Sequence, residues 1–315
     1  MATAFIFPGQ GSQAVGMGKA LAEQMPAARR VFEEVDEALG EKLSRILWEG
    51  PDEELTRTRN AQPALMAVSM AAMRALEAEG ISVASHAAFV AGHSLGEYSA
   101  LAAAGSLSVG DAAQLLRIRG DAMQAAVPVG VGAMAALLGM DLEPARAVAA
   151  EAASADEVCE VANDNAPGQV VVSGHKAAVE RAIEIARGKG ARRAMLLAVS
   201  APFHCALMQP AADVMANALA QAQIQSPAAP LVANVLARPL RDPGEIRQRL
   251  VEQVTGTVRW RESVLWLEAN GVDRLIEVGS GKVLTGLAKR IAPGLSAHAV
   301  GTPDDLTAMA AELRR

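Results

Sequence analysis

The stretch from residue 87 to residue 104 constrains the fold of this chain more than any other. An apolar run at residues 87–91 predicts a buried strand, and residues 97–104 predict a helix, so Gly92-His93-Ser94-Leu95-Gly96 should turn between them. The glycines allow the unusual dihedral angles that such a sharp turn needs. We therefore expect a nucleophile elbow that lifts the Ser94 hydroxyl beside free helix amides, which can stabilise an oxyanion. A purely structural turn is the alternative interpretation, because the pentapeptide also occurs by chance.

Composition sets the class of protein. The chain has 315 residues, of which 51% are hydrophobic, and its helical stretches are interrupted by 27 glycines and 15 prolines, which indicates an α/β protein. A 3% aromatic content and a net charge of -6 argue against a partner nucleic acid. The apolar run at residues 2–7 is too short for export or membrane insertion, so a cytoplasmic protein is expected. Cys159 and Cys205 lack ligand-spaced partners, which favours reduced buried thiols over a disulfide or a metal site.

Two glycine-rich stretches match nucleotide-binding motifs only in part. Residues 9–14 satisfy the relaxed dinucleotide fingerprint, but residues 27–39 have helical periodicity where the second strand should follow. Residues 279–282 imitate a P-loop, yet the upstream glycine is missing and Val283 occupies the position of the metal-binding Ser or Thr. We expect neither motif to bind a nucleotide. The first loop can instead carry Gln10 to the carboxyl end of a strand.

Arg119 is anomalous in its surroundings. Ser108 is expected to open a helix whose apolar face has Arg119 at its centre. A buried guanidinium stays protonated, and its planar fork suits a carboxylate. A structural ion pair or a snorkelling side chain is the alternative, but no protein partner is evident in the sequence. Another core helix is expected to begin at Pro63 and to end at Gly80.

Residues 128–199 read as a separate unit with the order β-α-β-β-α-β, which is ferredoxin-like. Its expected elements are a strand at 131–139, a helix at 143–153, strands at 157–162 and 169–173, a helix at 177–187 and a strand at 193–199. This unit interrupts a larger domain formed by residues 1–127 and 200–315, and it can supply one wall of a cleft around Ser94. Asn165, on the turn between its middle strands, is expected to face that cleft, although the same residues are ordinary in turns.

His204 is the best candidate for a general base acting on Ser94, because it follows a strand end. A lone histidine is usually structural. His204 is preferred partly by elimination, because His93 lies in the elbow, His86 precedes a strand, and the remaining two lie in loops, His175 and His298.

Taken together, these residues resemble the malonyl-CoA:acyl-carrier-protein transacylases, and the resemblance covers nearly the whole chain. The matching motifs are Phe7-Pro8-Gly9-Gln10-Gly11-Ser12-Gln13, Gly92-His93-Ser94-Leu95-Gly96-Glu97-Tyr98, Arg119-Gly120 with Met123-Gln124, Gly132-Ala133-Met134, Asn165-Ala166-Pro167-Gly168-Gln169, Phe203-His204 and Glu277-Val278-Gly279.

The resemblance implies an α/β-hydrolase-like larger domain with the ferredoxin-like insert, and a malonyl-serine intermediate between malonyl-CoA and holo acyl carrier protein. It implies no cofactor, metal, nucleic acid or membrane. The implied roles are Ser94 as nucleophile, His204 as base, the Gln10 and Leu95 amides as oxyanion hole, Arg119 as the carboxylate ligand, the Gln253 carbonyl as the group that orients His204, and Phe203 as a malonyl-selective residue.

Other functions stay open from sequence alone. A loading subunit of a polyketide or malonate decarboxylase system would use the same chemistry. A serine esterase would have no need of Arg119, and a non-catalytic assembly subunit would tolerate the loss of Ser94 or His204.

Overall fold

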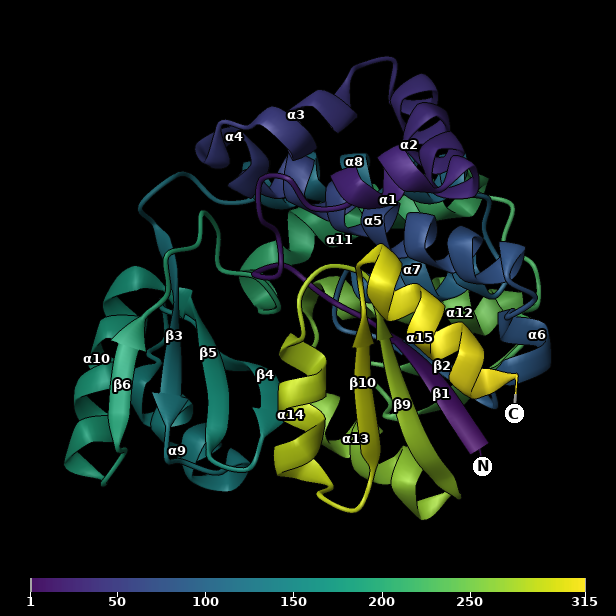
Figure 1. Ribbon diagram of the computed structural model, residues 1–315. Coiled ribbons are helices and arrows are strands. Elements are labelled where there is room, and N and C mark those ends of the chain that lie inside the picture. Colours follow the sequence, from purple (N-terminus) through teal and green to yellow (C-terminus); the bar gives the residue numbers. More distant parts are fainter. Residues whose placement is uncertain (1, 315) are drawn as a thin grey trace.

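The computed structural model describes residues 2–314, which fold around two β-sheets (Figure 1). The larger sheet has the order β10-β9-β1-β2-β7-β8, and its neighbours are parallel except for the pair β7 and β8. Its strands are β1 (Ala2–Phe7), β2 (Phe89–Gly92), β7 (Leu231–Ala233), β8 (Arg238–Leu240), β9 (Val272–Val278) and β10 (Ser296–Val300). In the register of β1 and β2, Phe7 lies opposite Gly92, so the loops that follow these two strands begin side by side. Those loops carry Gln10 and Ser94.

Helices cover both faces of this sheet (Figure 1). Helix α5 is the longest of them, is buried over most of its length and packs against α2, α7 and α8. The helices are α1 (Lys19–Gln24), α2 (Pro26–Leu39), α3 (Leu43–Glu49), α4 (Asp52–Thr56), α5 (Thr58–Ala78), α6 (Val83–His86), α7 (Gly96–Ala103), α8 (Val109–Ala125), α11 (Gln209–Gln221), α12 (Pro243–Thr255), α13 (Trp260–Ala269), α14 (Val283–Ile291) and α15 (Pro303–Leu313), with a 3₁₀ turn η1 (Ala206–Met208).

The prediction that Pro63 begins a helix is wrong, because α5 already begins at Thr58. Proline lacks the N–H that would bond to the carbonyl four residues earlier, which here belongs to Arg59. That carbonyl accepts instead from Nη1 of Arg117 on α8, at 2.8 Å. A side chain from the neighbouring helix thus replaces the missing bond and lets α5 run through the proline.

The smaller sheet has the order β4-β5-β3-β6, and all its neighbours are antiparallel. Its elements follow in the predicted order: β3 (Gly132–Leu138), α9 (Leu142–Ala152), β4 (Cys159–Ala166), β5 (Gln169–His175), α10 (Lys176–Gly188) and β6 (Arg193–Leu196). A hydrophobic core of its own lies between this sheet and the two helices. Most boundaries differ from expectation by one or two residues, and two differ by three or more. Strand β4 extends to Ala166, so Asn165 lies in a strand and not in a turn, and β6 ends at Leu196, before residue 199.

The two glycine-rich stretches have structural explanations. Residues 26–39 form α2, a helix, where a dinucleotide-binding domain would have its second strand. At the start of α14, the buried Glu277 carboxylate accepts from the amides of Leu284 at 3.0 Å and Thr285 at 2.7 Å. Two amides at the N-terminus of α14 are therefore paired with a carboxylate of the chain itself and not free for a phosphate.

Between residues 2 and 314, no helix is long and apolar enough to cross a membrane.

Candidate active site

The predicted elbow is present between β2 and α7, with Ser94 at φ 53°. Only glycine fits on either side of it. A Cβ on Gly92 would lie 1.9 Å from the backbone carbonyl group of Gly96, and one on Gly96 would lie 2.3 Å from the carbonyl oxygen of Phe7. Strand, turn and helix are therefore in contact through their backbones, and this packing holds Ser94 in the left-handed conformation that a side chain rarely adopts.

The Ser94 hydroxyl lies 2.7 Å from Nε2 of His204, and Nδ1 of the same ring lies 2.8 Å from the carbonyl oxygen of Gln253. A carbonyl can only accept, so Nδ1 carries the proton and Nε2 is left free to accept from Ser94. Burial and, to a smaller extent, the nearby Arg119 charge lower the pKa of His204 to about 3, which keeps the imidazole neutral. His204 is thus arranged as a base at neutral pH, with a carbonyl behind it in place of a carboxylate.

Arg119 reaches the same hydroxyl from α8. Its Nη2 lies 3.1 Å from Ser94 Oγ and 2.8 Å from Oε1 of Gln253, while its Nη1 lies 2.7 Å from Oε1 of Gln62. The expectation that Arg119 has no protein partner is therefore wrong. Its partners are neutral oxygens, however, and Nε has no hydrogen-bond partner among the described residues. A fully buried cation with this set of partners retains its affinity for an anion.

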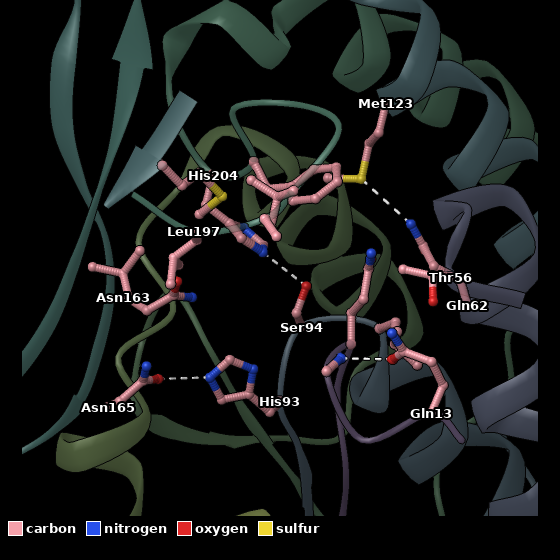
Figure 2. A pocket seen from close by; sticks show the side chains of 18 of the residues that line it. Gln13, Thr56, Gln62, His93, Ser94, Met123, Asn163, Asn165, Leu197 and His204 are labelled. Carbon is pink, nitrogen blue, oxygen red and sulfur yellow. Dashed lines mark hydrogen bonds between the residues drawn. The ribbon is translucent and has the colours of Figure 1, made fainter. Parts of the chain in front are cut away.

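A cavity of about 340 Å³ opens over Ser94 between the two sheets (Figure 2). One wall comes from the larger sheet and its helices and includes Gln10, Leu95, Arg119 and Met123. The facing wall comes from the smaller sheet and the segment after it, and includes Met134, Asn163, Asn165, Val171 and residues 197–199. The backbone N–H groups of Gln10 and Leu95 donate to no acceptor among residues 2–314, so both are available to a ligand.

Two further predicted residues line this cavity. Phe203, next to His204, is buried in its wall. Asn165 does face the cavity, and its Oδ1 accepts from Nε2 of His93 at 2.8 Å (Figure 2). The register of β4 and β5 shifts between Asp164 and Ala166, and Asn165 is left out of the pairing at that irregularity. The elbow histidine, which carried no predicted role, thus joins the two walls, and burial lowers its pKa.

Sequence reasoning missed three buried polar residues that surround the site. Gln62 holds Arg119, and its Nε2 donates to Thr58, which in turn donates to Gln10. The backbone amide of Asn234 donates to the Glu97 carboxyl, and the Asn234 side chain accepts from the Ser94 amide in the elbow. Burial raises the pKa of Glu97 to about 8. Glu97 is the last residue of the motif Gly-His-Ser-Leu-Gly-Glu. An acidic residue directly after the elbow is a signal in the sequence that could have identified it as part of the site.

The described residues include no cluster of potential metal ligands, and both of their thiols are buried. From residue 2 to residue 314, no group of three or more His, Cys, Asp or Glu side chains is placed to hold a metal ion. Cys159 and Cys205 are free and buried, as predicted, and burial raises their pKa values to about 12 and about 11. Both thiols are therefore protonated at neutral pH.

Comparison with known proteins gives a consistent result. The model of the acyl transferase domain family matches residues 4–297. The malonyl CoA-acyl carrier protein transacylase of Bacillus subtilis (strain 168) is 48% identical over 96% of this chain and 94% of its own length. The protein of the same name from Escherichia coli (strain K12) is 47% identical over 98% of both chains.

Solved structures agree with these matches. The acyl-carrier-protein-S-malonyltransferase from Bartonella henselae superposes with a TM-score of 0.98 at 57% identity, over the whole of both chains. A malonyl-transacylase in complex with a type II PKS acyl-carrier protein superposes with a TM-score of 0.95 at 42% identity, over 99% of this chain and all of that one.

Proposed function

The chain belongs to the acyl transferase domain family, and on that premise we propose that it transfers a malonyl group from malonyl-CoA to the phosphopantetheine thiol of holo acyl carrier protein. One observation carries the proposal. The Ser94 hydroxyl lies within hydrogen-bond distance of both a neutral imidazole, His204, and a buried guanidinium, Arg119. A nucleophile, its base and a receptor for a carboxylate therefore meet at one atom.

In the first half-reaction, His204 Nε2 takes the Ser94 proton as Oγ attacks the thioester carbonyl, and the free amides of Gln10 and Leu95 receive the oxyanion. The C–S bond then breaks, and the proton passes from His204 to the departing CoA thiolate. Arg119 holds the malonyl carboxylate throughout. In the second half-reaction His204 deprotonates the carrier's thiol, the thiolate attacks the malonyl ester, and the proton returns to Ser94 Oγ. No step requires a cofactor or a metal.

We further infer that residues 128–199 form a ferredoxin-like domain inserted into an α/β-hydrolase-like domain made of residues 1–127 and 200–315. The separate hydrophobic core of the smaller sheet supports this division, as does its strand order. The substrate cleft then lies between the two domains, with Phe203 and Asn165 facing the acyl group. We place the protein in the cytoplasm and its reaction in fatty acid synthesis.

Intact-mass spectrometry after mixing with malonyl-CoA, without acceptor, tests the proposal. The wild-type protein should gain one malonyl group, and Ser94→Ala should gain none because the attacking oxygen is gone. A label on Cys159 or Cys205, or no label on the wild type, would exclude a malonyl-serine intermediate.

Two controls separate the alternatives. The labelled protein should lose its malonyl group much faster with holo carrier protein than with buffer alone, and equal rates would indicate a serine esterase. Carriers from fatty acid and polyketide systems then distinguish the pathways, since a similar protein has been solved with a type II PKS carrier. Faster transfer to the polyketide carrier would overturn the assignment to fatty acid synthesis.

A further inference from the structure

Glu97 is a buried acid with no part in the proposed reaction. It lies in the first turn of α7 with 1% of its surface exposed, three residues after Ser94. Both of its carboxyl oxygens are engaged. Oε2 accepts from Nε2 of Gln253, and Oε1 accepts from the backbone amide of Asn234 at 2.7 Å. A buried carboxyl whose two oxygens accept from donors on distant segments fixes how those segments meet the helix.

The first of these contacts leads to Arg119. A guanidinium can only donate, so the Gln253 atom that faces it must be Oε1, and Nε2 must then point the other way. Nε2 meets the carboxyl of Glu97 and, at 2.9 Å, the carbonyl oxygen of Ser94. The amide of Gln253 is thus held between a cation and an acid, with each end facing the group it can bond. Its backbone carbonyl, in turn, holds His204.

The second contact leads to the elbow. While its backbone amide donates to Glu97, the side chain of Asn234 accepts from the Ser94 amide at 2.8 Å and donates to the carbonyl oxygen of Gly92 at 2.7 Å. Asn234 therefore bonds to the turn on both sides of its apex. This contact also occupies the Ser94 amide, which leaves the neighbouring Leu95 amide as the donor available to an oxyanion.

We propose that Glu97 is a positioning residue, which orients Arg119 through the side chain of Gln253 and holds the Ser94 turn through Asn234. The proposal rests on the transferase function given above. It assigns the selectivity of Arg119 partly to a carboxyl that touches neither the substrate nor the guanidinium.

The variant Glu97→Gln tests this idea, because it keeps the shape of the side chain but removes one acceptor. A carboxylate accepts on both oxygens, and a carboxylic acid keeps a carbonyl acceptor and has a single O–H that can rotate away, whereas an amide presents an NH₂ group with two donors that must face either the Asn234 amide or the Gln253 NH₂. We expect kcat/KM for malonyl-CoA to fall about 5- to 150-fold, the equivalent of about 1–3 kcal/mol for a buried group left unpaired. We also expect a lower ratio of malonyl-CoA to acetyl-CoA activity.

The matched control is Glu277→Gln. Glu277 is also fully buried and also accepts from two amides, but its donors, Leu284 and Thr285, lie at the start of α14 and not at the cavity. This variant should lower the free energy of unfolding and leave the malonyl-to-acetyl ratio unchanged. If both variants change the ratio equally, or neither does, Glu97 serves only the fold.

A double-mutant cycle isolates the route through Arg119. In an Arg119→Ala background, Glu97→Gln should have no further effect on the malonyl-to-acetyl ratio, and a persisting effect would overturn the proposal. If Glu97→Gln does not fold, Gln253→Met carries the test, since it removes the side-chain amide but keeps the carbonyl that holds His204. An unchanged ratio in that variant contradicts the proposal. Failure of the transferase function would differ, because the wild-type protein would then not be labelled at all.

Discussion

Arg119 combines full burial with a set of partners that carry no charge. It bonds to two glutamine oxygens and the Ser94 hydroxyl, and its nearest acid, Glu97, is separated from it by the Gln253 amide. The neutral partners keep the guanidinium in place without neutralising it. An incoming carboxylate is therefore the first anion to meet this charge directly.

We expect Arg119→Ala to lower kcat/KM for malonyl-CoA by about 30-fold to several thousand-fold, because truncating one partner of a buried ion pair typically costs about 2–5 kcal/mol. Acetyl-CoA lacks the carboxylate, so its use should change little or increase. Arg119→Lys should recover only part of the activity, since an ammonium has the charge without the fork. Steady-state kinetics with both substrates measure the ratio, and circular dichroism checks folding. Equal slowing of both substrates would make Arg119 structural.

Local patterns singled out Ser94 and Arg119, which meet in the cavity, but not the amides that hold them. Ser94 stands in an elbow motif, Arg119 breaks an apolar face, and both features are visible over a few residues. Gln62 and Asn234 are amides on other segments, and Asn234 is 140 residues from the Ser94 amide it accepts from. Nothing in their local sequence distinguishes a buried amide that bonds to the site from an exposed one.

Among the elements, the strand, turn and helix of the elbow form one unit of backbone contacts. Gly92→Ala should destabilise the protein by about 3 kcal/mol or more, because its Cβ would overlap the backbone of Gly96. Gly286→Ala is the matched control. Gly286 lies inside α14, and an added Cβ would have nothing within 4 Å, so alanine there should stabilise the protein by about 0.5–1 kcal/mol. Urea denaturation compares the two, and effects of the same sign would contradict this account.

The element order of the smaller unit was predictable from periodicity, whereas some element boundaries depended on tertiary contacts. The start of α5 was missed because the carbonyl orphaned by Pro63 is satisfied by Arg117, a residue of another helix. The end of β4 was missed because Asn165 looks like a turn residue in sequence, yet it sits at an irregularity of the strand and bonds to His93. In both cases a long-range hydrogen bond overrides a local preference.

At the scale of the whole molecule, two buried groups, His204 and Glu97, change the free energy of unfolding in opposite directions as the pH rises. His204 has a pKa of about 3 instead of 6.5, so between these values only the unfolded chain binds the proton, and stability rises with pH. Glu97 has a pKa of about 8 instead of 4.5, so there the native state holds the extra proton, and stability falls as pH rises. Together the two groups favour a maximum in the free energy of unfolding between pH 4.5 and 6.5.

The contribution of Glu97 can be separated by mutation. Urea unfolding of the wild-type protein should show a falling free energy of unfolding between pH 6.5 and 8, and Glu97→Gln should flatten this fall because an amide does not titrate. An equal fall in wild type and variant would mean that Glu97 does not carry the effect.

Ser94 and His204 both have left-handed backbone conformations, at φ 53° and 59°. Non-glycine residues held in this way cost about 1–3 kcal/mol each, out of a total stability of about 5–15 kcal/mol for a typical domain. These backbone conformations therefore lower the stability of the fold at the two residues to which the proposed reaction assigns the chemistry. Ser94→Gly and Ser94→Ala both lack the hydroxyl, but only glycine relieves the backbone. Glycine usually lowers the stability of a protein relative to alanine. At this position the reverse is expected: Ser94→Gly should have a higher free energy of unfolding than Ser94→Ala, by up to about 1 kcal/mol.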